Sequence, residues 1–455
     1  MIMFGTHFML DVPMPDGSSH TLAGAVPFKE VYIHALVRDA DRQKMSKTKG
    51  NVIDPIEIIE RFGTDAVRFT LASMASPGTD IAFSEARTEG NRAFANKIWN
   101  AARFLFMNLD RAREAGIPVD RILRTSVILS RAAQRAGFIS GADQGTPSLS
   151  SETWEDVPQT PLESSWILAR LSQTAAAVNA SLAEYRFDEA ANHVYQFFWG
   201  DLCDWYLEIV KLRLNFGEAD DKTAAAAALA TLFHVFESAL RLLSPFMPFL
   251  TEEIWHALYA GAPPAKSIAL TSYPQASDYP SDEAAIVEMR DLQFLTTELR
   301  AIRKDLSIPE GQTFPGYVLG VNMGDAKTGI LRTPGDLLSA HSDILGRLTR
   351  VSPIQEVGAQ ERYGSLSSLS WRQGLFEVAL QYHKKIDVPA ERERLTKDLA
   401  KYEKGLAAAE RQLSNDSFMS KAPAHIVEGL RKQAAETRTV YDKTKAALDA
   451  LPPNN

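Results

Sequence analysis

The C-terminal stretch of the chain carries the clearest periodicity in the sequence, and this periodicity allows little except paired helices. Apolar and small residues recur at alternating steps of four and three in two runs, which is the spacing of helices that pack along one stripe. The first run consists of Leu395, Leu399, Tyr402, Leu406, Ala409 and Leu413. The second consists of Leu430, Ala434, Thr437, Tyr441, Thr444, Leu448 and Leu451. Turn-forming residues, including Asn415 and Pro423, separate them.

We therefore expect an antiparallel coiled-coil hairpin over residues 386–451. Its second stripe is polar and composed of small residues, so the hairpin is marginal alone and a partner surface is plausible. A self-contained or dimerising coiled coil is the alternative that spacing alone leaves open.

A long helix and a helical bundle are predicted ahead of this hairpin. Ser84 is placed to cap a helix that runs to about Leu109, with a buried stripe of Phe94, Ile98, Ala101, Leu105 and Leu109. Residues 164–312 contain further amphipathic stretches, one of them over about 222–243. Their predicted N-terminal caps are Ser165, Asp188, Thr251 and Asp282. These stretches predict a helix bundle with an aromatic core.

Residues 313–385 differ from the helices on either side. Strand-like runs at 316–321 and 375–380 flank a predicted helix over 335–348, which indicates a small α+β module.

A short basic loop near the N-terminus is the clearest candidate for chemistry. Between Asp41 and Asn51 there are four cations against one anion, in a chain of formal net charge -8. Lys44 and Lys47 are point charges on flexible stems, neighbouring hydroxyl groups can donate hydrogen bonds, and Gly50 allows a close turn. The pattern is typical of phosphate positioning, although a solvated surface turn is the alternative for such a loop in isolation.

The residues around this loop predict how it is held. Val31–His34 reads as a short buried strand that continues toward the loop through residues 36–39. After the loop, Asp54 and Pro55 begin a helix that ends at Gly63, and Thr64 is placed to cap the next.

Composition excludes several classes of protein. The 455 residues are 45% hydrophobic, without an uninterrupted apolar run of membrane-spanning length or a basic lead-in of a secretory signal, so we expect a cytoplasmic protein of several domains. Cys203 is the single cysteine, which excludes an internal disulfide and a cysteine-rich zinc knuckle, and we expect no metal site.

Separate segments along the chain resemble one enzyme family. Lys44–Asn51 and Gly63–Phe69 resemble the KMSKS region of class I aminoacyl-tRNA synthetases. Gly200–Glu208 and Leu243–Trp255 look like landmarks of the anticodon-binding domain in the valyl, isoleucyl and leucyl branch. Two further segments, Phe94–Phe104 and Asn415–Pro423, are most similar to the valyl enzymes, the second to the turn of their C-terminal arm.

This resemblance implies a mainly α, multidomain chain. Its parts are the C-terminal part of a Rossmann-like class I catalytic domain (1–83), a connecting helix of the stem-contact region (84–116), a flexible insertion or linker (117–163), an anticodon-binding helical bundle (164–312), the small α+β module (313–385) and a tRNA-binding coiled-coil arm (386–451).

The resemblance also implies a reaction and its residues. Valine is activated by ATP, accompanied by Mg²⁺, and is then transferred to tRNA(Val). Lys47 and Lys44 are the implied catalytic residues, with Lys47 neutralising the departing pyrophosphate; Met45 anchors the loop, and Ser46 and Thr48 complete the ATP-binding set, Thr48 standing where the family has serine. The candidate tRNA contacts are Lys211, Arg213, Arg300, Arg303, Lys304, Lys397, Lys401 and Arg411.

One departure from the family is large. The family's His-x-Gly-His element has no counterpart, because none of the nine histidines lie three apart. We therefore expect this chain to be a C-terminal portion of an enzyme that is a monomer when complete, and to be unable to form valyl-adenylate alone. A noncatalytic tRNA-binding protein derived from a synthetase and an isoleucyl enzyme are the alternatives.

Overall fold

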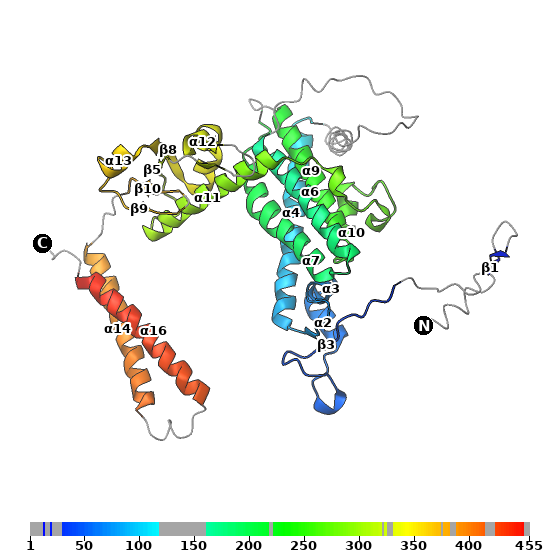
Figure 1. The fold of residues 1–455 in the computed structure, drawn as a ribbon, viewed down its shortest axis with the longest axis horizontal. Coiled ribbons are helices and arrows are strands. Elements are labelled where there is room, and N and C mark those ends of the chain that lie inside the picture. The colour runs from blue at the N-terminus through cyan, green and yellow to red at the C-terminus, as the bar shows by residue number, and fades with distance from the viewer. Residues whose placement is uncertain are drawn as a thin grey trace. The chain divides into compact units, whose positions relative to one another are not determined.

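The computed structural model is mainly helical and divides into two compact units, residues 1–380 and 381–455 (Figure 1). It describes residues 30–117, 161–217, 222–320, 331–374, 376–382, 388–414 and 424–449, together with three short strands. These strands are β1 (Val12–Pro13), β2 (Ser19–His20), which pairs antiparallel with β1, and β6 (Met323–Gly324). The predicted linker at 117–163 lies almost entirely outside the described residues.

The first described part of unit 1 carries the basic loop. Strand β3 (Val37–Arg38) pairs in parallel with β4 (Ile81–Ala82), and between them lie the 3-10 helix η1 (Lys47–Lys49), α2 (Pro55–Phe62) and α3 (Thr64–Ser73). The predicted cap of α2 is confirmed, since the Asp54 carboxylate accepts a hydrogen bond from Ile56 N at 2.8 Å. The predicted end at Gly63 is also confirmed, with φ 88°.

Two local predictions here are wrong. The backbone of residues 31–34 forms no strand, and Val31 and Ile33 are 80% and 87% exposed. Tyr32 packs against Tyr185 and Phe187, with ring centroids 5.4 and 5.5 Å away, but this contact leaves Val31 and Ile33 exposed. Thr64 begins α3 but does not cap it, because Gly63 takes the cap position.

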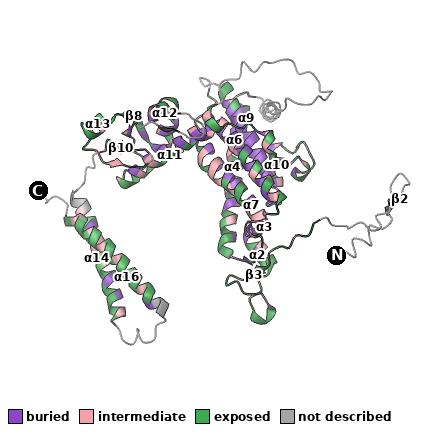
Figure 2. Cartoon of the chain, viewed as in Figure 1, coloured by how far each residue is buried: buried purple, intermediate pink, exposed green. Residues whose placement is uncertain are grey.

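The bundle is built from helices that the periodicity located well. They are α4 (Glu85–Glu114), α6 (Leu162–Ala183), α7 (Phe187–Gln196), η3 (Phe197–Tyr206), α8 (Leu207–Val210), α9 (Lys222–Leu243), α10 (Pro248–Leu258) and α11 (Glu283–Asp305). All five residues of the predicted α4 stripe are buried. Figure 2 shows buried residues along the helices of the bundle. By length and composition α9 could cross a membrane, but 83% of its apolar window is buried inside the protein, as in the core helix of a bundle.

Several predicted caps in the bundle are wrong. Pro161 precedes α6, so Ser165 lies within that helix. Asp188 lies inside α7 and accepts a hydrogen bond from Ser76 Oγ at 2.5 Å. Thr251 is buried inside α10, where its hydroxyl donates to Met247 O at 2.9 Å. The observed cap positions Pro161, Arg186 and Met247 lie four, two and four residues before the predicted ones. The predicted cap Asp282 is confirmed.

The helix predicted to begin at Asp188 is not a continuous α-helix. Its middle third, η3, is a π-helix flanked by α7 and α8. A π-helix inserts residues into the helical ladder and so changes the direction in which later side chains point. No propensity in the sequence marks this segment.

The module after the bundle is a four-stranded sheet with one long helix. The strand order is β8 (Val351–Val357), β5 (Phe314–Leu319), β10 (Val378–Leu380) and β9 (Trp371–Arg372), with only β5 and β8 parallel. Helix α12 (Pro334–Thr349) begins at a capping box of Thr333 and Asp336, close to the predicted start. A short hairpin of β6 and β7 (Leu331–Arg332) and the helix α13 (Ala359–Tyr363) complete the module.

Unit 2 is a pair of helices, α14 (Val388–Leu413) and α16 (Ala424–Asp449), lying side by side (Figure 1). The buried residues Leu395, Leu406 and Ala409 belong to the predicted first stripe, and the second stripe is half-buried from Leu430 to Leu448, its last member Leu451 lying outside the described residues. The predicted hairpin is therefore present in its helices, while its turn, residues 415–423, lies outside the described residues.

Candidate functional site

The basic loop leaves β3 and enters α2 through a tight turn. Ser46 caps η1, and its Oγ accepts a hydrogen bond from Lys49 N at 3.2 Å. Gly50 adopts φ 68°, in the left-handed region that favours glycine, and its N–H donates to Lys47 O at 3.2 Å. The backbone around Lys47 is thus fixed by local hydrogen bonds.

Two residues that the sequence analysis did not single out tie the ends of this loop together. Asn51 Oδ1 accepts from Ser46 N at 2.9 Å, and Asn51 Nδ2 donates to Asp39 Oδ2 at 2.8 Å. The other oxygen of Asp39 accepts from Gln43 N at 2.7 Å. The side-chain hydrogen bond from Asn51, followed by that from Gln43, holds the pKa of Asp39 below its usual value. The sequence does contain a signal for these two roles: Asp39 directly follows β3 and Asn51 directly follows Gly50, and Asp and Asn side chains at such turns often hydrogen-bond to nearby backbone groups.

The loop contains one residue that anchors it by apolar contacts and two lysines that are exposed. Met45 packs against the cluster of Ile58, Phe62, Ala66, Val67 and Phe83. Lys44 and Lys47 are exposed, and within the described ranges neither ammonium group has a carboxylate partner. Thr48 is exposed beside them, and the Lys49 ammonium lies 3.4 Å from Gln43 Oε1. The arrangement can therefore present two positive charges and a hydroxyl group to an anionic ligand.

The elements that carry this loop are fastened to the bundle by Asp65 and Arg68 of α3. The buried Asp65 carboxylate accepts from Leu250 N at 2.6 Å and from Phe249 N at 3.3 Å, both in the first turn of α10. Burial raises the pKa of Asp65 against the lowering effect of these hydrogen bonds. Arg68 Nη2 donates to Pro245 O at 3.1 Å.

The candidate RNA contacts of the bundle differ in availability. Lys211 forms an ion pair with Glu208 at 2.6 Å on the surface. Arg213 is bound on both sides, to the buried Glu163 and to Asp343 of α12, at 2.7 and 2.6 Å. With both carboxylates in place, its guanidinium group is committed to holding α12 on the bundle.

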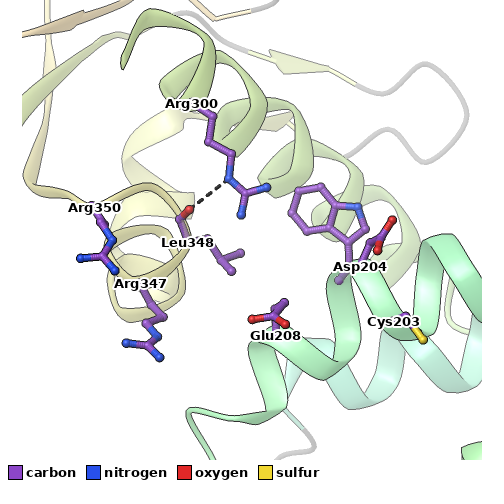
Figure 3. Close-up of a pocket in the computed structure, with 8 residues that line it drawn as sticks. Cys203, Asp204, Glu208, Arg300, Arg347, Leu348 and Arg350 are labelled. Carbon is purple, nitrogen blue, oxygen red and sulfur yellow. Dashed lines mark hydrogen bonds between the residues drawn. The ribbon is translucent and has the colours of Figure 1, made fainter. Parts of the chain in front are cut away.

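The three cations of α11 divide in the same way. Arg303 is buried and donates to Arg350 O and Pro309 O at 3.0 and 2.9 Å, so it is out of reach of a ligand and we withdraw it as an RNA contact. Its helical position looked exposed because the sequence gives no sign that α12 and β8 pack there. Arg300 donates only its Nε group, to Leu348 O at 3.0 Å (Figure 3), and Lys304 is exposed.

In unit 2 the three candidate cations lie on the exposed faces of α14. Lys397 pairs with Glu393 at 2.6 Å one turn away, whereas the side chains of Lys401 and Arg411 have no ion-pair partner among the residues that the structure describes. Because exposed ion pairs contribute little to stability, each of these side chains can bind a phosphate without the loss of a strong interaction.

Metal and thiol chemistry find no support in the described ranges. No group of three or more histidine, cysteine, aspartate or glutamate side chains there could hold a metal ion. Cys203 is buried, and burial raises the pKa of its thiol to about 12. It is therefore an unreactive core residue.

Comparison with known proteins gives a consistent assignment. The model of class I tRNA synthetases (I, L, M and V) matches residues 2–84, the anticodon-binding domain of tRNA ligase matches 164–318, and the valyl tRNA synthetase tRNA binding arm matches 387–452. The loop, the bundle and the arm thus define parts of a class I aminoacyl-tRNA synthetase.

Comparison with individual relatives identifies the family within this class of synthetases. The valine–tRNA ligase of Syntrophotalea carbinolica is 36% identical over 451 residues, covering 99% of this chain and 43% of the relative, and that of Solibacter usitatus is 36% identical, covering 96% and 41%. The chain belongs to the valine–tRNA ligase family, and it spans less than half the length of these relatives. Among solved structures, the Agrobacterium radiobacter K84 agnB2 LeuRS–tRNA–LeuAMS complex is 20% identical with a TM-score of 0.34, covering 76% of this chain and 31% of that one.

Proposed function

We propose that this chain supplies the phosphate-binding loop and the tRNA-binding surfaces of a valine–tRNA ligase. The reaction is the ATP-dependent activation of valine followed by transfer to tRNA(Val). The observation that carries the proposal is the loop geometry: Lys44 and Lys47 are unpaired within the described ranges, on a backbone held by Ser46, Gly50 and Asn51. A preformed loop loses little conformational freedom when it meets a triphosphate.

Each loop residue then has a physical task. Lys47 stabilises the charge that develops on the departing pyrophosphate, and Lys44 supports it. Met45 keeps the loop docked on its apolar cluster. The Ser46 oxygen is used as a cap acceptor, which leaves its hydroxyl hydrogen for a phosphate oxygen, and Thr48 offers a second hydroxyl group. Mg²⁺ enters as the ion that accompanies ATP.

The tRNA side of the function involves both units. Lys211, Arg300 and Lys304 of unit 1 and Lys397, Lys401 and Arg411 of unit 2 are the cations that remain as candidate phosphate contacts. Arg213 and Arg303 instead hold α12 and the start of β8 in place. We propose a cytoplasmic enzyme that works as a monomer when complete.

A binding measurement tests the substrate. The 455-residue chain is titrated against tRNA(Val) and tRNA(Ile) at several salt concentrations. We expect tighter binding of tRNA(Val) and an affinity that falls steeply with salt, because phosphate contacts release counterions. Equal binding of both tRNAs contradicts the valine assignment, and a flat salt response removes the cations from the interface.

A second measurement tests the catalytic part. We expect no valine-dependent ATP–pyrophosphate exchange by these 455 residues alone, because they contain no His-x-x-His pair. Exchange by the purified chain contradicts this expectation. A noncatalytic tRNA-binding protein is the rival function, and a Lys47→Ala variant that fully preserves function in the cell supports that rival.

A further inference from the structure

One side-chain amide joins the two ends of the basic loop. The half-buried Asn51 donates its Nδ2 group to Asp39 Oδ2 at 2.8 Å and to Lys44 O at 3.3 Å. Its Oδ1 atom accepts from Ser46 N at 2.9 Å. Among the residues that the structure describes, the other hydrogen bond that joins residues 39–44 to residues 46–51 is a long one, 3.4 Å, from the Lys49 ammonium group. The join between the two ends therefore depends mainly on Asn51.

The start of the loop has a strained backbone. Arg42 adopts φ 60°, a left-handed conformation that is uncommon for residues other than glycine. Arg42 N donates to Asp39 O at 3.0 Å, and Gln43 N donates to the Asp39 carboxylate at 2.7 Å. A backbone of this kind persists where surrounding contacts determine it, and such places are frequent at ligand-binding sites. Asp39 therefore fixes the start of the loop, as Asn51 fixes its end.

The Asp39 carboxylate is satisfied by N–H groups and not by the lysines of the loop. It accepts from Asn51 Nδ2 and from the backbone N–H groups of residues 41 and 43, and no lysine of the described residues forms an ion pair with it. The hydrogen bond from Asn51 is the main reason why the pKa of Asp39 lies below its usual value, so the group is charged at neutral pH. An unsatisfied carboxylate in this loop would attract the nearest ammonium group. With its oxygens occupied, Asp39 leaves Lys44 and Lys47 for a ligand.

We propose that Asp39 and Asn51 are positioning residues for the phosphate chemistry of this loop. Both act through Lys44 and Lys47, and neither side chain touches the triphosphate. Asn51 fixes the backbone that carries the two lysines, and Asp39 accepts its amide and so holds the loop closed. A closed loop binds a triphosphate without a large loss of conformational freedom. The inference rests on the proposed function and deepens it, because it names the residues that make both lysines available to the same anionic ligand.

A reciprocal exchange of the two side chains isolates their contact from their separate effects. Asp39→Asn keeps an acceptor for Gln43 N but no longer offers a carboxylate to Asn51 Nδ2. Asn51→Asp keeps the acceptor for Ser46 N but places two carboxylates opposite each other. The double variant Asp39→Asn/Asn51→Asp restores one amide opposite one carboxylate at the wild-type net charge. It loses only the 3.3 Å hydrogen bond to Lys44 O.

The test uses trypsin on the full 455-residue chain, with thermal unfolding to verify that each variant is folded. Cleavage after Lys47, measured by mass spectrometry, reports how often the loop opens, because a protease cleaves a folded loop from an open state. The concentration of inorganic triphosphate with Mg²⁺ that halves this cleavage reports binding, and a small peptide substrate in the same tube verifies that trypsin remains active. Gln43→Ala is the matched control, since it removes an amide side chain from the same loop and retains the N–H group that bonds Asp39.

We expect Asn51→Ala, Asn51→Asp and Asp39→Asn to be cleaved after Lys47 roughly tenfold faster than wild type or more, because each loses a hydrogen bond that involves a charged group. The triphosphate concentration for half protection should rise severalfold, since only the closed fraction of the loop binds. Gln43→Ala should behave like wild type, and the double variant should recover most of both effects. A folded Asn51→Ala with wild-type cleavage, or a double variant no better than its single variants, overturns the proposal.

The two readouts separate failure of this inference from failure of the proposed function. If triphosphate protects wild type and protects a faster-cleaved Asn51→Ala at the same concentration, the pair only stabilises the turn; the positioning role is overturned and the proposed function stands. If triphosphate does not slow cleavage of wild type, phosphate binding by this loop fails. In that case, faster cleavage of Asn51→Ala that the double variant reverses still supports the pair as the contact that fixes Lys47, and unchanged cleavage overturns it.

Discussion

Replacing Asp65 by alanine should loosen the join between the loop-bearing helices and the bundle. The residue at the cap position of α10 is Met247, which has no side-chain acceptor for the helix N-terminus. Asp65, 184 residues from Phe249 in sequence, supplies this acceptor from α3 to both Phe249 N and Leu250 N. The substitution leaves two amide donors of a helix first turn without a partner.

The magnitude follows from the two hydrogen bonds lost. Removing a helix cap costs about 0.5–2 kcal/mol, and a hydrogen bond to a charged group contributes about 1.5–3 kcal/mol. One of the two contacts is short and the other is long, so we expect a loss of about 2–3 kcal/mol, which corresponds to roughly a 30- to 150-fold rise in local opening. Asp65→Asn keeps an acceptor and removes the cost of burying a charge, so it should stay close to wild type near neutral pH.

Hydrogen exchange measured at the Phe249 and Leu250 amides reports this opening directly. Thr64→Ala is the matched control, because Thr64 lies beside Asp65 on α3 and makes no capping hydrogen bond. Unchanged protection of both amides in Asp65→Ala would refute the capping role, as would equal loss in the control variant.

Three further outcomes are expected. In an enzyme that carries this loop, Lys47→Ala should lower the rate of ATP–pyrophosphate exchange by about 100-fold or more, whereas Thr48→Ser, which keeps the hydroxyl group, should be nearly neutral; a full rate in Lys47→Ala would contradict charge stabilisation by this lysine. Burial, with a smaller contribution from the nearby Arg241, lowers the pKa of His234 from 6.5 to about 4. Because the unfolded chain then binds the proton more tightly, the free energy of unfolding should be constant above about pH 6.5 and fall by about 3 kcal/mol as the pH drops to 4. Denaturant titrations of wild type and His234→Gln should show this pH dependence only in wild type. Lys401→Ala should reduce the slope of log affinity for tRNA(Val) against log salt by about 1, and an unchanged slope would place Lys401 outside the interface.

The sequence was sufficient to predict structural features that depend only on neighbouring residues. The cap at Asp54, the stop at Gly63 and the limits of α9 follow from residues within one turn of the feature, and all three were predicted. The loop around Lys47 was found in the same way, from charge, hydroxyl groups and glycine spacing. Its internal support by Asp39 and Asn51 was missed, although both residues are adjacent to the elements that they fasten.

The sequence by itself determined the helical character of the chain, the basic loop and the paired stripes of the arm, because period and capping are properties of neighbouring residues. Only the tertiary structure decided that Asp65 caps a helix far along the chain, that Arg303 is buried, and that Arg213 joins α12 to the bundle. The physical reason is that burial and pairing depend on which elements meet in space, and periodicity along one helix carries no information about the surface packed against it.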